Sequence, residues 1–478
     1  MNQSQVIFKN TVVLGLSQII ERVSTVYLSI FVARKLGAEG LGVYSVAMVY
    51  YGLLFLAAEL GTTTYLVREI AKDRNQTSRL VVHAAIMSGA LALVLALGAR
   101  LSLPLLKYSQ QLQGALYVIV WAVLPAALKA IQESVFVAFQ RAEFLTYSAL
   151  VAAVINIVAT MYLLWHGYGV VSLVIAFTIV QFVVTMFYFY SINRYIIRLR
   201  WEFSTRFAMK MLREVRAFTG SSLVQGFLSR PEILLLSFTK NDAQIGFYSA
   251  ALRIVDLWQL IPRSFMTTLY PVLSNYYHVG DERRHLLRQK SIKYLLAVSF
   301  PLTAGLLIVA RPTLHLLYGP AFGPSVVVLR ILVWTIPLGS LWAVLWRVLS
   351  ARGEHGEAFE SQAITLLIRL ILGYAVIRMF GSVGAAISTS VSAVALDWLL
   401  ISRVRRDGSR LEFLSVAGRS AAAAMCMAVI TVALQSYLQL WALICVSAAA
   451  YVVMMLMFRA FSEDDYILFR TLWRVRST

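Results

Sequence analysis

The stretch GVYSVA at residues 42–47 decides the fold, because a closely similar stretch, GFYSAA, returns at residues 246–251. Each stretch opens a long apolar run directly after a short turn. Self-similarity of this kind marks a repeated architecture, and transporters are often built from repeated helical bundles. The two stretches therefore predict an internal duplication.

Further matches continue this register along the chain. RAE at residues 141–143 precedes the fifth apolar run and RGE at residues 352–354 precedes the eleventh, and Gly169 then corresponds to Gly384. Each repeat accordingly holds six helices. Because an even number of helices brings both halves in from the same side, we expect a pseudo-two-fold axis along the membrane normal and a central cavity between two six-helix lobes.

The composition places these runs in a membrane. Of 478 residues, 59% are hydrophobic and only 14% are charged, whereas a soluble chain has about a quarter charged. Since about 20 apolar residues cross roughly 30 Å of hydrocarbon, the chain has room for about fourteen spanning helices. We predict an all-α polytopic membrane protein with two six-helix lobes and two C-terminal helices. The predicted spans cover residues 10–33, 41–65, 80–99, 112–138, 144–165, 169–193, 217–238, 245–275, 291–310, 325–350, 361–379, 383–402, 416–436 and 440–459.

The uneven distribution of Lys and Arg orients these spans. Loops on alternate sides differ several-fold in basic residues, and rich loops lie at residues 68–79, 194–216, 283–293 and 403–419. The positive-inside rule then predicts a cytoplasmic (inner) membrane protein with both termini cytoplasmic. It also accounts for the net charge of +20, so we expect no nucleic-acid partner.

Several classes of protein are excluded by what the chain lacks. No segment between the spans is long enough for a catalytic domain, so we do not expect an enzyme. Cys426 and Cys445 both lie in apolar runs and the six histidines are scattered, which argues against a disulfide framework, a metal site and a cofactor. The apolar N-terminal stretch is interpreted as the first span rather than a removed signal peptide. The predicted domains are residues 1–215, an N-terminal lobe with a basic cytoplasmic linker; residues 216–410, a C-terminal lobe; and residues 411–478, two further helices with a basic tail.

Basic residues inside the predicted spans point to an anionic cargo. A charge near the middle of a bilayer costs at least about 2.5 to 3.5 kcal/mol, so it should face a partner or a wet cavity. Guanidinium groups bind phosphate oxygens in bidentate fashion without losing their charge. Arg263, which follows Pro262, is assigned a structural role. The candidate substrate-binding residues are Arg22, Arg253, Arg230, Arg347, Arg369 and Lys129.

Acidic residues in the same spans leave a second interpretation open. Glu133 lies four residues after Lys129 and Asp256 lies three residues after Arg253, so each can neutralise its neighbour on one helix face. A membrane carboxylate can also take up H+ or Na+ and couple transport to an ion gradient. The candidates for ion pairs or ion coupling are Glu21, Asp256, Glu133 and Glu232.

Further predictions concern residues next to the charged side chains of the predicted spans and tyrosines at the span ends. Glu21 adjoins Arg22 and therefore points to another side of the helix. Proline between Arg230 and Glu232 removes a backbone hydrogen bond and permits a bend that would serve a rocking motion. Asp397, near the end of the twelfth run, is assigned a structural role. Tyrosines at span ends are predicted to be interfacial anchors, among them Tyr50, Tyr51 and Tyr188.

The basic loop at residues 194–216 alternates its cations with Trp201, Phe203 and Phe207. This pattern is compatible with an amphipathic helix on anionic headgroups. The alternative is an ordinary positive-inside loop.

Three stretches resemble a known family. FVARKLGAEGLGVYSVAMVYYGLLFLAAELGTTTYLVREIA at residues 31–71 is similar to the signature of the first two helices of polysaccharide and lipid-linked oligosaccharide flippases. These belong to the multidrug/oligosaccharidyl-lipid/polysaccharide exporter superfamily. IGFYSAALRIVDLWQLIPRSFMTTLYPVLS at residues 245–274 resembles their eighth helix, and LHLLYGPAFGPS at residues 314–325 resembles an outer loop. The resemblance covers the first twelve spans.

The resemblance implies alternating access that moves a polyprenyl pyrophosphate-linked oligosaccharide between leaflets for surface polysaccharide biosynthesis. It implies membrane lipids and polysaccharide polymerase or export machinery as partners, and a chain that functions as a monomer. The family's eighth helix carries a basic and acidic couple like Arg253 and Asp256, and lipid II flippases, a sister group, resemble this chain in a first-helix arginine like Arg22. A cation-coupled multidrug exporter and a lipid II-type flippase of the same superfamily remain alternatives.

Overall fold

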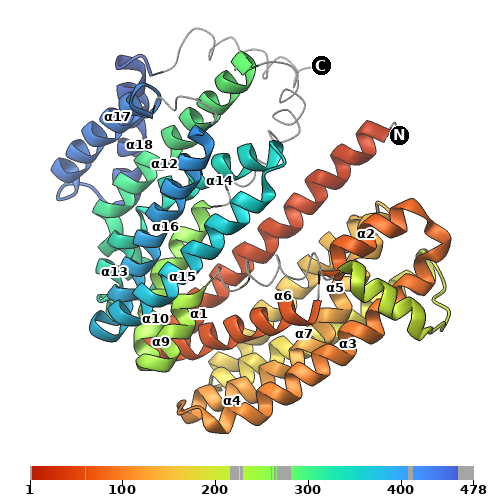
Figure 1. The fold of residues 1–478 in the computed structure, drawn as a ribbon. Coiled ribbons are helices and arrows are strands. Elements are labelled where there is room, and N and C mark those ends of the chain that lie inside the picture. The colour runs from red at the N-terminus through yellow and green to blue at the C-terminus, as the bar shows by residue number, and fades with distance from the viewer. Residues whose placement is uncertain are drawn as a thin grey trace. The chain divides into compact units, whose positions relative to one another are not determined.

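The computed structural model describes residues 3–59, 61–215, 226, 230–259, 261–262, 265, 281–406 and 413–460, and nearly all of them are helical (Figure 1). Within these ranges the chain forms no strand, which confirms the all-α fold class. Two predicted spans, 217–238 and 245–275, lie partly outside the described residues, as do Arg263 and the basic tail after residue 460.

The helices follow one another with short connections. The first part of the chain contains α1 (Gln3–Glu59), α2 (Thr62–Lys72), η1 (Arg74–Gln76), α3 (Thr77–Ser102), η2 (Leu103–Leu105), α4 (Gln110–Ile119), η3 (Val120–Ala122), α5 (Val123–Ala138), α6 (Glu143–Trp165), α7 (Val170–Tyr195), a helix at 205–215, α9 (Pro231–Thr239) and α10 (Asp242–Trp258). The second part contains α12 (Asp281–Tyr318), η4 (Pro320–Phe322), α13 (Ser325–Leu332), α14 (Thr335–Ala351), α15 (His355–Phe380), α16 (Ser382–Arg405), α17 (Phe413–Leu434) and α18 (Leu440–Met457).

Among the described residues, 11 helical segments are long and apolar enough to cross a membrane. The first of them, Ile19–Glu59, overlaps both of the first two predicted spans, because α1 is two helices joined at Gly37, whose φ of 71° is not helical. The count of fourteen spans stays a prediction, since two predicted spans are only partly described.

The end of the second span differs from the prediction. The helix ends at Glu59, and Gly61 adopts a left-handed conformation with φ 69° before α2 begins at Thr62. The predicted boundary at residue 65 was wrong because the apolar run continues across this turn. A glycine pays no steric penalty for positive φ, so Gly61 can separate two helices that hydropathy alone joins.

Contacts between Cα atoms divide the chain into two compact units. Unit 1 comprises Met1–Ala250 and Leu370–Ala385, and unit 2 comprises Ala251–Arg369 and Ala386–Thr478. The division into domains at residues 215 and 410 stays a prediction.

Unit 1 has a large apolar core built from α2, α3, α5, α6, α7 and the helix at 205–215. Phe136 is fully buried in this core, and its ring forms an edge-to-face pair with Tyr188 at a centroid distance of 5.0 Å. Other apolar side chains of this unit face outward, such as Met186 of α7 at 69% exposure. Large outward-facing apolar side chains along membrane-length helices indicate a lipid-facing surface.

Unit 2 is organised around α12. Helix α12 packs against α14 through Leu295, Leu345 and Leu349, and α17 and α18 lie along its other side. The Tyr451 hydroxyl of α18 donates a 2.6 Å hydrogen bond to the carbonyl oxygen of Ala297 in α12. The C-terminal helices are therefore fixed to this unit by packing and by a hydrogen bond to its longest helix.

The two motifs that reveal the repeat cross each other within unit 1. A Cβ added at Gly42 would come closer than 3.0 Å to the carbonyl oxygen of Asp242, and one added at Gly246 would come equally close to that of Ala38. The distance along the sequence from Gly42 to Gly246 equals that from Ala38 to Asp242. The two glycines are therefore equivalent positions of the repeat, and so are the residues that they meet. The contact is therefore reciprocal, as expected for two helices related by a pseudo-two-fold axis.

The other repeat matches are less strict. Arg141 pairs with Glu143 at 3.2 Å and Arg352 pairs with Glu354 at 3.8 Å, so both triplets form an ion pair at a turn. The residue with positive φ, however, stands at a different place in each turn. It is Gln140, before Arg141, in the first repeat and Gly353, after Arg352, in the second. Gly169 caps α7, whereas Gly384 lies inside α16. Different turn lengths thus shift the register between the repeats.

Candidate functional site

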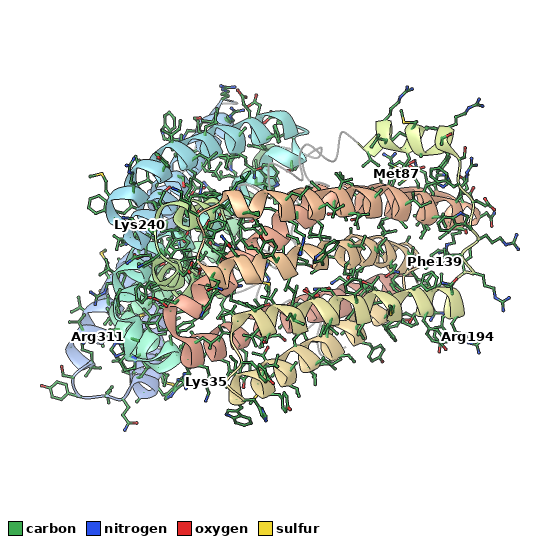
Figure 2. The ribbon with its side chains drawn as sticks, turned by 90° about the horizontal axis from the view of Figure 1, so that it is seen from below. Lys35, Met87, Phe139, Arg194, Lys240 and Arg311 are labelled. Carbon is green, nitrogen blue, oxygen red and sulfur yellow. The ribbon has the colours of Figure 1, made fainter. Side chains whose placement is uncertain are left out.

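Labelled residues mark the two ends of the helices of unit 1 in Figure 2. Figure 2 shows Phe139 and Arg194 near one end and Lys35 and Lys240 near the other. This arrangement agrees with the alternation of loops that the sequence predicts for a polytopic chain.

Lys129 and Glu133 lie on one face of α5, one helical turn apart. The Lys129 Nζ is 3.8 Å from the Glu133 Oε1, and the two side chains are 22% and 35% exposed. Pairs at this spacing attract each other, and the attraction is stronger where water is scarce. Lys129 is thus at least partly neutralised by its own helix.

Further polar groups of unit 1 surround this pair. Glu21 and Tyr51 of α1 and Tyr188 of α7 lie close enough to Lys129 to interact with it electrostatically. We call Glu21, Tyr51, Lys129, Glu133 and Tyr188 the α5 cluster. With both carboxylates ionised, the α5 cluster carries one negative charge more than positive.

Arg22 differs from the other candidates in its surroundings. It lies in α1, is partly buried, and makes no hydrogen bond or ion pair within the described part of the chain. Its neighbour Glu21 is exposed and belongs to the α5 cluster. A cation without a protein partner at membrane depth is expensive unless water or an anion reaches it.

The remaining candidate cations already have partners inside the protein. Arg230 lies directly before α9, whose first residue is Pro231, and Glu232 in the first turn is 1% exposed. Each of these charged residues makes interactions with other parts of the chain: Arg230, Glu232, Arg253, Asp256, Arg347 and Arg369. Pro231 is the first residue of α9, where its missing N–H is not needed.

The six candidate cations divide between the units. Unit 1 holds Arg22, Lys129 and Arg230, and unit 2 holds Arg253, Arg347 and Arg369. That they share one chamber stays a prediction.

Three of the tyrosines expected to be interfacial anchors contact other side chains of unit 1, and Tyr188 is buried rather than interfacial. The Tyr50 hydroxyl lies 2.7 Å from that of Tyr108, and Tyr188, only 2% exposed, shares a hydrogen bond with Ser148. Tyr51 stands edge-on to Phe177 at 5.2 Å and belongs to the α5 cluster. Sequence reasoning missed these residues because tyrosines at a span end look the same whether they face lipid or neighbouring helices.

Asp397 of α16 is 3% exposed, and neither of its carboxyl oxygens has a hydrogen-bond partner among the described residues. Burying a polar group without a hydrogen bond costs roughly 1–3 kcal/mol in mutational data. The structural role assigned to Asp397 stays a prediction.

Among the described residues, no group of three or more His, Cys, Asp or Glu side chains is placed to hold a metal ion.

Replacing Asp397 by Leu is expected to stabilise the protein by about 1–3 kcal/mol, because the buried carboxyl is removed while the branched shape of the side chain is kept. Thermal unfolding of the purified protein measures the change. Asp397→Asn is the matched control, since its amide keeps two buried polar atoms and should gain little. A lower unfolding midpoint for the Leu variant than for the Asn variant would show that the carboxyl has a stabilising partner.

Two family models match this chain. The model described as polysaccharide biosynthesis protein matches residues 31–327, more than half of the chain. The model described as lipid II flippase MurJ matches residues 198–462.

Two proteins of Haloferax volcanii are similar in sequence. The probable low-salt glycan biosynthesis flippase Agl15 is 25% identical over 173 residues, 36% of this chain and 37% of its own length. The probable flippase AglR is 27% identical over 212 residues, 43% and 44% of the two chains.

The matches to these two relatives thus cover less than half of each relative. Solved structures extend the similarity to the fold of the whole chain. The lipid II flippase MurJ in an inward closed conformation superposes with a TM-score of 0.80 at 15% identity, over 96% of this chain and 99% of that one. An inward-facing MATE family multidrug resistance transporter gives a TM-score of 0.66 at 16% identity, over 83% and 98%.

Fold and matches together define the class of protein: a many-helix membrane protein of the multidrug/oligosaccharidyl-lipid/polysaccharide exporter superfamily. Within that superfamily, the chain belongs to the polysaccharide biosynthesis protein family.

Proposed function

We propose that this protein is a flippase that moves a polyprenyl pyrophosphate-linked oligosaccharide across the cytoplasmic membrane for surface polysaccharide biosynthesis. The observation that carries the proposal is Arg22, a partly buried cation on a membrane-length helix with no partner among the described residues. Membership in the polysaccharide biosynthesis family and the names of the two archaeal relatives, both called probable flippases, support it.

The chemistry of the cargo suits the candidate cations. A lipid pyrophosphate carries negative charge that must leave water, and an arginine fork binds its oxygens without being deprotonated. Arg22 and Lys129 in unit 1, and Arg253 in unit 2, would contact the pyrophosphate in a cationic central cavity, with Arg230, Arg347 and Arg369 as further contacts. The duplicated halves would alternate access by rocking against each other.

The α5 cluster is the natural place for a coupling ion. Because Glu133 pairs with Lys129, Glu21 is the surplus carboxylate of the cluster, and these two carboxylates would take up H+ or Na+ during the transport cycle. The protein would act as a monomeric transporter rather than an enzyme, with both termini in the cytoplasm, next to polysaccharide polymerase or export machinery.

A lipid II-type flippase is the second candidate. The match of residues 198–462 to the lipid II flippase family favours it, and both cargoes carry the same pyrophosphate. The two are distinguished by the lipid-linked sugar that accumulates when the protein is depleted. A multidrug exporter is less consistent with basic residues in the cavity, since these would repel cationic drugs.

Removing the charge of Arg22 or Arg253 is expected to reduce polysaccharide export by about 10- to 100-fold, the effect of losing one charge-assisted hydrogen bond. Surface polysaccharide is measured in cells that carry Arg22→Gln or Arg253→Gln, with the amount of folded protein in the membrane determined in parallel. Arg100→Gln, which removes an exposed cation at the end of α3, is the control. Normal export by both variants would refute the proposed substrate contacts.

A further inference from the structure

The segment after α7 is held firmly against unit 1. The backbone N–H of Arg200 donates to the Ser78 Oγ at 2.7 Å, and that of Ser204 donates to the His83 Nε2 at 2.8 Å. The buried His83 ring stacks on Phe203 at 5.2 Å. The segment therefore has a defined orientation at this end of the helices.

The helix at 205–215 that follows is amphipathic. Met211 and Val215, one turn apart, are fully buried in the core of unit 1, and Phe207 packs against the same core. Glu214 accepts a hydrogen bond from Tyr65 of α2, and burial together with this bond raises the pKa of the Tyr65 phenol. The side of the helix that faces unit 1 is thus fixed by apolar packing.

The other side of this helix and Trp201 just before it expose apolar and basic side chains together. Trp201 is 80% exposed, Met209 55% and Leu212 42%, and the cations Arg206, Lys210 and Arg213 are exposed beside them. In Figure 2 the nitrogen-tipped side chains of this short helix project away from the bundle, at the end marked by Arg194 and Phe139. We call these six residues the 201–213 surface.

The charged residues of the segment are mostly basic. Residues 194–215 contain the basic residues Arg194, Arg198, Arg200, Arg206, Lys210 and Arg213, all exposed. The only acidic residues in this range are Glu202 and Glu214, and Glu214 is engaged by Tyr65. The exposed apolar side chains of α7, such as Met186 at 69% and Tyr195 at 59%, lead directly into this segment.

We propose that the 201–213 surface docks on the headgroups of anionic phospholipids. A positive-inside loop needs only charge, whereas this surface adds the exposed Trp201 just before the helix and the exposed Met209 and Leu212 among its cations. Tryptophan favours the interface between headgroups and acyl chains, and each nearby cation attracts an anionic leaflet. Docking would fix unit 1 at the membrane surface whatever cargo the protein carries.

Fluorescence quenching of Trp201 tests the proposal. The full-length protein is placed in nanodiscs of phosphatidylcholine that contain a fixed fraction of brominated phosphatidylglycerol or brominated phosphatidylcholine. The signal of Trp201 is the difference between the unaltered protein and Trp201→Phe. We expect brominated phosphatidylglycerol to quench Trp201 more strongly, and the preference to fall as salt is added.

A pair of triple variants separates docking from general charge. Arg206→Gln/Lys210→Gln/Arg213→Gln should lower the preference for phosphatidylglycerol at least tenfold, since each cation near the surface contributes about fivefold. The matched control removes three exposed cations at the same end and leaves the preference intact: Arg68→Gln, Lys72→Gln and Arg141→Gln.

Equal quenching by the two lipids in the unaltered protein, absence of quenching by either lipid, or an equal loss in both triple variants would overturn the proposal. None of these readouts involves transport, so their outcome is independent of the proposed flippase activity.

Discussion

Gly42→Ala and Gly246→Ala are each expected to destabilise the protein strongly. In either variant the new methyl group would meet a backbone carbonyl oxygen, of Asp242 or of Ala38, closer than 3.0 Å. A flexible side chain could turn aside, but a carbonyl within a helix cannot move without breaking its own hydrogen bond. Overpacking against side chains costs about 1–3 kcal/mol, and we expect at least that much here.

The thermal unfolding midpoint of the purified protein measures this loss. Gly52→Ala in α1, the helix that contains Gly42, is the matched control, because a Cβ at Gly52 meets nothing within 4 Å. Alanine there should be neutral or slightly stabilising, since it lowers the entropy of the unfolded chain. The double variant should lose little more than either single one, because both substitutions open the same crossing. Unfolding of both single variants at the midpoint of the Gly52 control would contradict the close crossing.

This crossing shows why the repeat was visible in the sequence. Gly42 and Gly246 recur within their helices because the helices meet at them, and close approach leaves room for no side chain. The end of the second span was not visible in the same way. Hydropathy does not register one left-handed glycine, so Gly61 separated helices that the apolar run had joined.

The candidate site was predictable only as far as local geometry reaches. Lys129 and Glu133 share one helix, so their spacing in sequence set their distance. Tyr51 and Tyr188 reach the same cluster from α1 and α7, and no local pattern encodes such a contact between helices. Arg22 was correctly placed on a membrane-length helix, but its lack of a partner among the described residues depends on what packs around α1.

Lys129→Met and Glu133→Gln are expected to destabilise the protein separately and far less when combined. Removing one member of a buried ion pair leaves the other charge uncompensated and costs about 3–5 kcal/mol. We expect about 3 kcal/mol for each single variant, at the low end of this range, because the two side chains keep 22% and 35% of their exposure. Unfolding midpoints of the four proteins form a double-mutant cycle that isolates the interaction.

The double variant also separates the two interpretations of Lys129. A pair that serves only the fold can be replaced by neutral side chains, so Lys129→Met/Glu133→Gln would fold and export polysaccharide normally. If Lys129 instead contacts the pyrophosphate, or Glu133 the coupling ion, the same protein would fold but fail to export. Because the double variant leaves the α5 cluster without a cation near Glu21, we expect the additional substitution Glu21→Gln to raise the unfolding midpoint of the double variant. A fall in that midpoint would show that Glu21 is held by a partner other than Lys129.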